Sequence, residues 1–144
     1  MRLIQSLIGG FAGAIALNLL HETARRIDPK APRVDLLGEQ ALTKSLDALE
    51  IDAPQGRELY LATLAADVLS NGIYFAAIGG SEKSNLIRNG LATGIIAGLG
   101  AIKLPEPLGL DDAPVNRSQA TQLMTVAWYT IGGLVAAIVI KKLR

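Results

Sequence analysis

The stretch from residue 59 to residue 80, LYLATLAADVLSNGIYFAAIGG, is long enough to cross a bilayer as a helix, yet it carries Asp67 near its middle. A spanning helix needs roughly 20 predominantly apolar residues. A charge at membrane depth costs about 2.5 to 3.5 kcal/mol on insertion scales, so such a residue usually faces the protein interior. The sequence therefore predicts a membrane protein in which Asp67 is turned towards other helices.

The composition points to the same class of protein. Half of the residues are hydrophobic, the mean hydropathy is +0.34, and only 19% are charged. Soluble domains carry roughly 25% charged residues. The net charge of +1, with no cluster of Lys and Arg interleaved with aromatics, argues against nucleic acid as a partner. With no cysteine and one histidine, thiolate and multi-histidine metal sites cannot form within one protomer, so we expect neither a metal nor another cofactor.

Four apolar runs predict an all-α membrane protein with four transmembrane helices, forming a single integral membrane domain over residues 1–144. The link between the second and third spans is so short that these helices are expected to run antiparallel. The order of span, polar connection and span occurs twice, which is the pattern of two hairpins that are parallel repeats. The predicted spans are about 3–22, 57–80, 85–103 and 119–141.

The first span is expected to continue as a helix beyond its apolar run, through Arg25, until Pro29 ends it. A cleaved signal peptide is the alternative, since residues 14–16, Ala-Ile-Ala, have the small-x-small form of a cleavage site. We favour the span, because the residues that follow are still apolar where a cleavage region would be polar.

Residues 35–50 have a different pattern, in which apolar residues recur at steps of three and four. This spacing predicts one amphipathic helix, too short and too charged to cross a membrane. Its polar face is more acidic than basic, which disfavours a dedicated binder of anionic lipid. We therefore expect an interfacial helix that packs over the ends of the spans.

A polar cluster is predicted around Asp67. Asn71 follows one helical turn later on the same face, and the far end of the first span lies at a similar depth, so a pairing with Asn18 or His21 is expected. A carboxylate in this place can accept and release a proton, or it can fasten two helices through hydrogen bonds, which is the interpretation we favour. The candidate residues of this intramembrane site are Asp67, Asn71, Ser70, Tyr74, Asn18, His21 and Glu22.

Glycine recurs every four residues at Gly90, Gly94 and Gly98, and a shorter strip is formed by Gly9 and Gly13. Such strips let two helix backbones approach closely. They predict either packing within the chain or the interface of a homo-oligomer, and the sequence does not choose between the two.

The connection at 104–118 contains three prolines and predicts an irregular loop. Its acids Glu106, Asp111 and Asp112 are candidate catalytic groups or metal ligands of an enzyme that acts on lipid at the interface. This is the weakest hypothesis, because neighbouring carboxylates in a proline-rich loop are most often solvated and no DxxxD or HxxxD spacing lies on a helix.

Trp128 and Tyr129 fall in the middle of the fourth span, away from the interfacial belt where such residues usually collect. Their indole N–H and hydroxyl are therefore expected to find hydrogen-bond partners inside the protein.

The sequence favours a structural or accessory membrane protein that contacts membrane lipid and acts as a homo-oligomer or with another membrane protein. A proton- or ion-coupled transporter or channel protomer that uses Asp67 is the first alternative, and the interfacial enzyme is the second. Basic residues outnumber acids around the two termini and the short turn at 81–84. By the positive-inside rule, both termini are expected in the cytoplasm, with the protein in the inner membrane of a bacterium.

Overall fold

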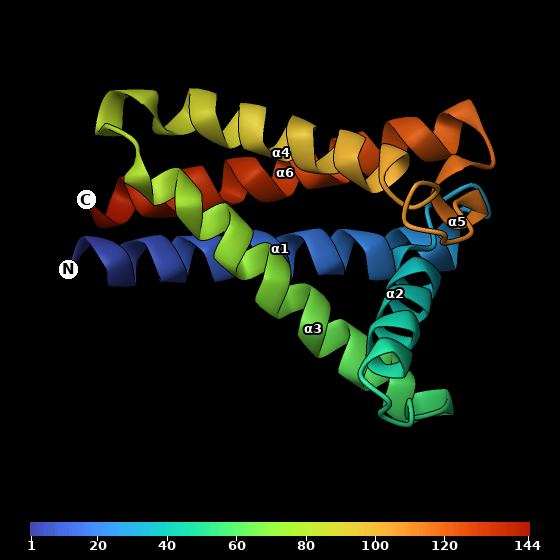
Figure 1. Ribbon diagram of the computed structural model, residues 1–144. Coiled ribbons are helices and arrows are strands. Elements are labelled where there is room, and N and C mark those ends of the chain that lie inside the picture. The colour runs from blue at the N-terminus through green and yellow to red at the C-terminus, as the bar shows by residue number, and fades with distance from the viewer.

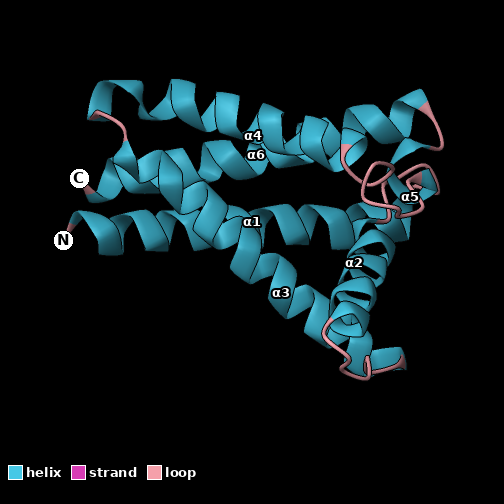
Figure 2. Ribbon diagram, viewed as in Figure 1, coloured by secondary structure: helices cyan, strands magenta, loops and turns pink.

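The computed structural model describes residues 1 to 144 and contains helices but no strand, which confirms the predicted all-α class (Figure 2). Two short 3₁₀ helices, η1 (Ala77–Gly80) and η2 (Lys83–Asn85), form the turn in the middle of the chain. The α-helices are α1 (Arg2–Ile27), α2 (Val34–Ala48), α3 (Gly56–Ala76), α4 (Leu86–Lys103), α5 (Ala113–Asn116) and α6 (Gln119–Leu143).

The helix ends follow local sequence signals. α1 continues through Arg25 and Arg26, two cations in its last turn, and ends directly before Asp28 and Pro29, as predicted. At the start of α6, the Ser118 hydroxyl accepts a hydrogen bond from the backbone N–H of Thr121 at 3.1 Å. This is a standard helix cap, which satisfies one of the otherwise unpaired first N–H groups.

α6 lies between α1 and α4, and α3 crosses α1 and then diverges from the other helices (Figure 1). Both termini lie at one end of the molecule. At the opposite end, α2 runs crosswise to α1 and lies beside α5. Leu37 is the only buried residue of α2, so much of the apolar face predicted for residues 35–50 is only partly covered.

The glycine strip of α4 packs directly on the backbone of α6. A Cβ atom added to Gly94 would lie 2.6 Å from the Cα atom of Thr130, and one added to Gly98 would lie 2.7 Å from the Cα atom of Val126. One added to Gly90 would lie 2.6 Å from the carbonyl oxygen of Gly133. Only glycine permits these approaches, so the strip is used within the chain and does not remain free for another subunit.

α1 uses its own glycines in the same way. A Cβ atom added to Gly9 would lie 2.3 Å from Ile140, and one added to Gly13 would lie 2.4 Å from the carbonyl oxygen of Gly132. Gly132 and Gly133 of α6, which the sequence analysis did not single out, face α1 and α4 respectively. We call α1, α4 and α6 together the glycine-packed core.

Three helical segments are long and apolar enough to cross a membrane: α1, the continuous run of α3 and η1 over Gly56–Gly80, and α6. α4 is not among them. It has 18 residues and carries Arg88 in its first turn and Lys103 at its end. The predicted third span is thus present as a helix with nearly the expected bounds, but its length and composition do not by themselves establish a membrane crossing.

Candidate functional site

Asp67 lies in the middle of α3 and accepts hydrogen bonds from two asparagines. Asn18 of α1 donates to Oδ2 at 2.8 Å, and Asn71 of α3 donates to Oδ1 at 2.9 Å. The same Asn18 amide donates to the carbonyl oxygen of Ala14 at 3.0 Å. The expected pairing of Asp67 with the first helix is therefore present, and it joins α1 to α3.

Two other predicted members of the cluster do not bind the Asp67 carboxylate. The Ser70 hydroxyl donates to the backbone carbonyl oxygen of Asp67 at 3.2 Å, which is a contact within one helical turn. The Tyr74 hydroxyl donates to the carbonyl oxygen of Thr93 at 3.2 Å and so links α3 to α4. Both side chains still line, together with Asp67, an apolar groove between α3 and α4 that is described below.

A cavity of about 20 Å³ lies on the α1 side of Asp67. His21 and Thr63, which line it, are only 6% and 5% exposed, and both ring nitrogens of His21 and the hydroxyl of Thr63 are buried without a hydrogen-bond partner. An unpaired buried polar group costs about 1 to 3 kcal/mol. The cavity is lined by Asn18, His21, Glu22, Arg25, Val34, Asp35, Tyr60, Thr63, Leu64 and Asp67.

His21 and Glu22 of the predicted cluster thus belong to the cavity, while Tyr60, Thr63, Arg25 and Asp35 were missed. Thr63 precedes Asp67 by one helical turn and shares its face, so helical periodicity was a usable signal for it. Asp35 reaches the cavity from α2, and no pattern along the sequence brings that residue to the site.

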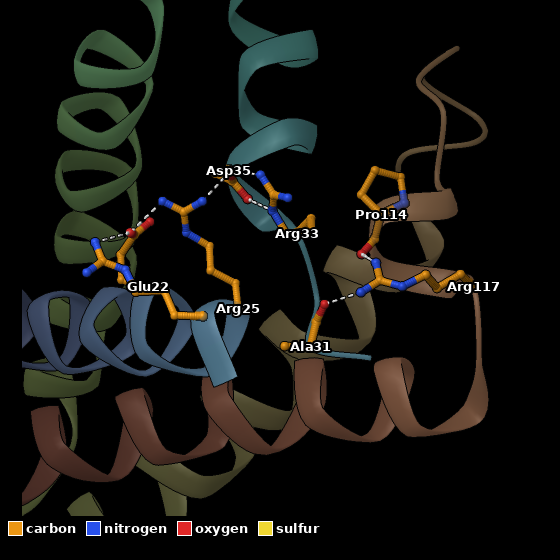
Figure 3. A network of polar contacts seen from close by, with 8 residues as sticks. Glu22, Arg25, Ala31, Arg33, Asp35, Pro114 and Arg117 are labelled. Atoms are coloured by element: carbon orange, nitrogen blue, oxygen red, sulfur yellow. Dashed lines mark hydrogen bonds and ion pairs between the residues drawn. The ribbon is translucent and has the colours of Figure 1, made fainter. Parts of the chain in front are cut away.

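Ion pairs join charged residues of the cavity lining on α1 and α2 (Figure 3). Arg25 binds Glu22 at 2.8 Å and reaches Asp35 at 3.5 Å, while Arg33 binds Asp35 through two contacts of 2.7 and 2.9 Å. Burial raises the pKa of the Asp35 carboxyl, but the hydrogen bonds from Arg33 and the charges of Arg33 and Arg25 outweigh it and hold this pKa below its ordinary value. Asp35 is therefore charged at neutral pH and holds α2 to α1.

A second clamp holds the segment before α2 against α5 (Figure 3). The Arg117 guanidinium donates to the carbonyl oxygens of Pro29, Ala31 and Pro114. The backbone N–H of Arg33 also donates to the carbonyl oxygen of Pro114, at 2.9 Å. Hydrogen bonds to backbone carbonyl oxygens therefore hold the segment before α2 in place, and this fixes the position of α2 beside the cavity.

Asp67 also lines a groove of about 600 Å³, which lies between α3 and α4 and is bordered by residues of α2. Eleven of its seventeen lining residues are hydrophobic. Its polar side chains gather around Asp67, Ser70, Asn71, Tyr74 and Tyr129, while Ile96, Ala97 and Leu104 line its α4 side. Asp67 therefore lines both a narrow polar cavity and a wide apolar groove.

The acids of the proline-rich loop do not converge on a common point. Asp111 accepts from the backbone N–H of Ala113 at 3.0 Å, and Asp112 accepts from the Asn116 amide at 2.7 Å. The Glu106 side chain is exposed. No group of three or more His, Cys, Asp or Glu side chains is placed to hold a metal ion. Asp111 and Asp112 thus shape the loop around α5, and the three acids do not form a joint site.

The two aromatic residues of α6 have different surroundings. The Trp128 indole N–H is buried without a partner, so the expected hydrogen bond of this residue is absent. Tyr129 packs its ring edge-on against His21, with the ring centroids 5.8 Å apart.

Comparison with known proteins finds no family model, no curated protein and no solved structure that matches this chain.

Proposed function

We propose that this chain is an integral protein of a bacterial inner membrane with four spans, and that it acts as an accessory protein that binds a membrane lipid in the groove between α3 and α4. The fourth span is α4. It runs antiparallel beside α6 with Gly90, Gly94 and Gly98 seated along that helix, so a membrane crossed by α6 is crossed by α4 as well. α2, which lies crosswise to α1, is the interfacial helix (Figure 1).

The groove is the observation that carries this proposal. It is lined mainly by apolar side chains and opens between two helices whose surroundings in a membrane are acyl chains, so an acyl chain is the medium that fills it. Its polar groups lie together at the Asp67 end, where Ser70 and Tyr74 offer hydroxyls. An occupant with an apolar chain and a polar group satisfies both parts of this lining.

The orientation follows from charge. Arg2, Lys83, Lys141 and Arg144 lie at the end that holds both termini, together with the η1–η2 turn. We place this end in the cytoplasm. Because both glycine strips are used inside the chain, an oligomer or a partner protein has to bind to another surface, such as the exposed residues of α1 and α3.

Proton- or ion-coupled transport is the second candidate, and one observation favours it. Asp67 lines the groove and also the cavity that ends at the partly exposed pair of Glu22 and Arg25. An ionisable side chain between two compartments is a common feature of proton-linked transporters. Proton-dependent solute flux in liposomes that contain the protein tests this candidate.

The lipid proposal is tested by filling the groove. A Cβ atom added to Gly100 meets no atom closer than Leu104 at 3.5 Å, so Gly100→Leu places a side chain in the groove without a backbone clash. We expect native mass spectrometry of protein extracted with its lipids to show a bound lipid for the unaltered chain and at least a tenfold lower occupancy for this variant.

Ala92→Leu is the matched control, because Ala92 is exposed on the same helix and does not line the groove. It should retain the lipid. Equal lipid occupancy in all three proteins would show that the groove is not the binding site.

A further inference from the structure

The cavity beside Asp67 has the volume and the chemistry of a water site. Its size of about 20 Å³ exceeds the ~10 to 15 Å³ that one water molecule requires. A bound water also needs two to four polar partners. His21 and Thr63 offer them, because both His21 nitrogens and the Thr63 hydroxyl are buried, unpaired and part of the lining of this cavity.

The donor set favours water over a cation. The Nε of Arg25 is a third buried group without a partner in the same lining, and it can only donate a hydrogen bond. A metal cation requires acceptors and is repelled by a guanidinium, whereas water both donates and accepts. Neutral imidazole and a hydroxyl group also each offer one donor and at least one acceptor.

We propose that this cavity binds a water molecule that bridges His21 and Thr63 and gives the Asp67 carboxylate a hydrogen-bonded route to the aqueous edge at α2. The route begins at Asp67, passes the water and His21, and ends at Glu22 and Arg25, whose side chains are each 23% exposed. When a proton moves to Asp67 along this route, the water donates one proton to the carboxylate and accepts another from a ring nitrogen of His21. The second ring nitrogen accepts a proton that comes through Glu22, so each relay group breaks one bond to hydrogen as it forms another, and release follows the reverse order. The ionisable groups that face His21 are Glu22 and Arg25 on α1, Asp35 on α2, Tyr60 and Asp67 on α3, and Tyr129 on α6.

This inference is independent of the lipid groove, since the water site lies on the opposite side of Asp67. Gly100→Leu should lower lipid occupancy at least tenfold and leave the water site unchanged, so failure of one proposal does not imply failure of the other.

The single histidine of the chain makes the water site directly observable. In protein labelled with ¹⁵N-histidine and reconstituted in lipid bilayers, the ring signals of His21 need no further assignment. We expect solid-state NMR to show magnetisation transfer from water protons to the His21 ring. Its absence in the unaltered protein would overturn the proposal.

Substitution of Thr63 tests which groups hold the water. Thr63→Val keeps the methyl group that lies against Gly38 but removes the hydroxyl, and should lose most of the transfer. Thr63→Ser keeps the hydroxyl and should retain it. Thr125→Val is the control, because Thr125 is equally buried but donates to its own helix at the carbonyl oxygen of Thr121 and does not line the cavity. Undiminished transfer in Thr63→Val would overturn the assignment.

The link to Asp67 has its own test. Asp67→Asn should shift the His21 ring ¹⁵N resonances, because it changes the group at the other end of the route. Ser70→Ala should leave them in place, since Ser70 donates only to the backbone of its own helix and does not line the cavity. If Asp67→Asn leaves both ring resonances unchanged, the route does not reach Asp67.

Discussion

The glycine-packed core and the region around α3 are built by opposite means. In the core, α1 and α4 meet α6 backbone to backbone, with no space for a side chain between Gly90 and Gly133 or between Gly13 and Gly132. α3 approaches α1 closely near Gly10 and Gly72, and its N-terminal part lies away from α1 (Figure 1).

The difference explains where the polar groups lie. A contact between backbones excludes both water and side-chain chemistry, whereas diverging helices leave room that side chains must fill or line. Asp67, the small polar cavity and the apolar groove all occur on the diverging side. We infer that the core supplies stability and that the α3 side supplies binding.

The largest expected effect comes from filling the core. Gly94→Leu should destabilise the protein by about 3 kcal/mol or more, the upper part of the range for overpacked cores, because the added atoms meet the backbone of α6 at Thr130 and Tyr129. Thermal unfolding in detergent, followed by size-exclusion chromatography, measures this loss.

Gly100→Leu is the matched control on the same helix. Its added side chain enters the groove, and leucine is a better helix former than glycine by roughly 0.5 to 1 kcal/mol, so the stability should be unchanged or higher. If the two variants unfold at the same temperature, the contrast between core and groove is wrong.

A smaller effect is expected at the end of the cavity. Asp35→Asn removes the acceptor of two hydrogen bonds from Arg33 and the partner of Arg25, and should cost about 1 kcal/mol, between the values for exposed and buried ion pairs. Urea unfolding measures this loss. Because the lost contacts hold α2, hydrogen exchange of the variant should also show weaker protection of α2 than of α6.

The same residue predicts an acid transition. The pKa of Asp35 is lower in the folded protein than its ordinary value of 3.8, so its contribution is complete above that value and is lost as the pH falls through the lowered pKa. The melting temperatures of the unaltered protein and of Asp35→Asn should therefore differ at about pH 6 and converge only as the pH falls to about pH 3. Asp47→Asn, an exposed acid of α2 outside any ion pair, should follow the unaltered protein throughout.

Much of the fold could be predicted because apolar runs, prolines and glycines act locally. They indicated every long helix, including α2, and the depth of Asn18 relative to Asp67 indicated their contact. The cavity and the groove could not be predicted, since they depend on how far α3 diverges and on where the 28–33 segment places Asp35. Trp128 shows a related limit, because its residue type demands a partner that the packing around it does not supply.

The smallest effect on stability is expected at Asp67 itself. In Asp67→Asn one carboxylate oxygen becomes an amide NH₂ group. This group can face Asn71, whose amide can turn to present its oxygen, while Asn18 keeps its NH₂ group towards the new amide oxygen and the carbonyl oxygen of Ala14. Both hydrogen bonds survive and no carboxylate has to be buried, so the stability should change by less than about 1 kcal/mol. Asp67→Leu, by contrast, removes the acceptor of both hydrogen bonds and should be the less stable variant.

Together, the variants Asp67→Asn and Asp67→Leu distinguish a structural role of Asp67, which joins two helices, from a role in proton exchange. If Asp67 only joins α1 to α3, Asp67→Asn keeps lipid binding and any activity, and Asp67→Leu loses stability alone. If the carboxylate exchanges a proton, proton flux in liposomes disappears in Asp67→Asn although its melting temperature is retained, because an amide cannot release a proton in the accessible pH range. A large loss of stability in Asp67→Asn would contradict both interpretations, because it would mean that the negative charge itself holds the diverging helix in place.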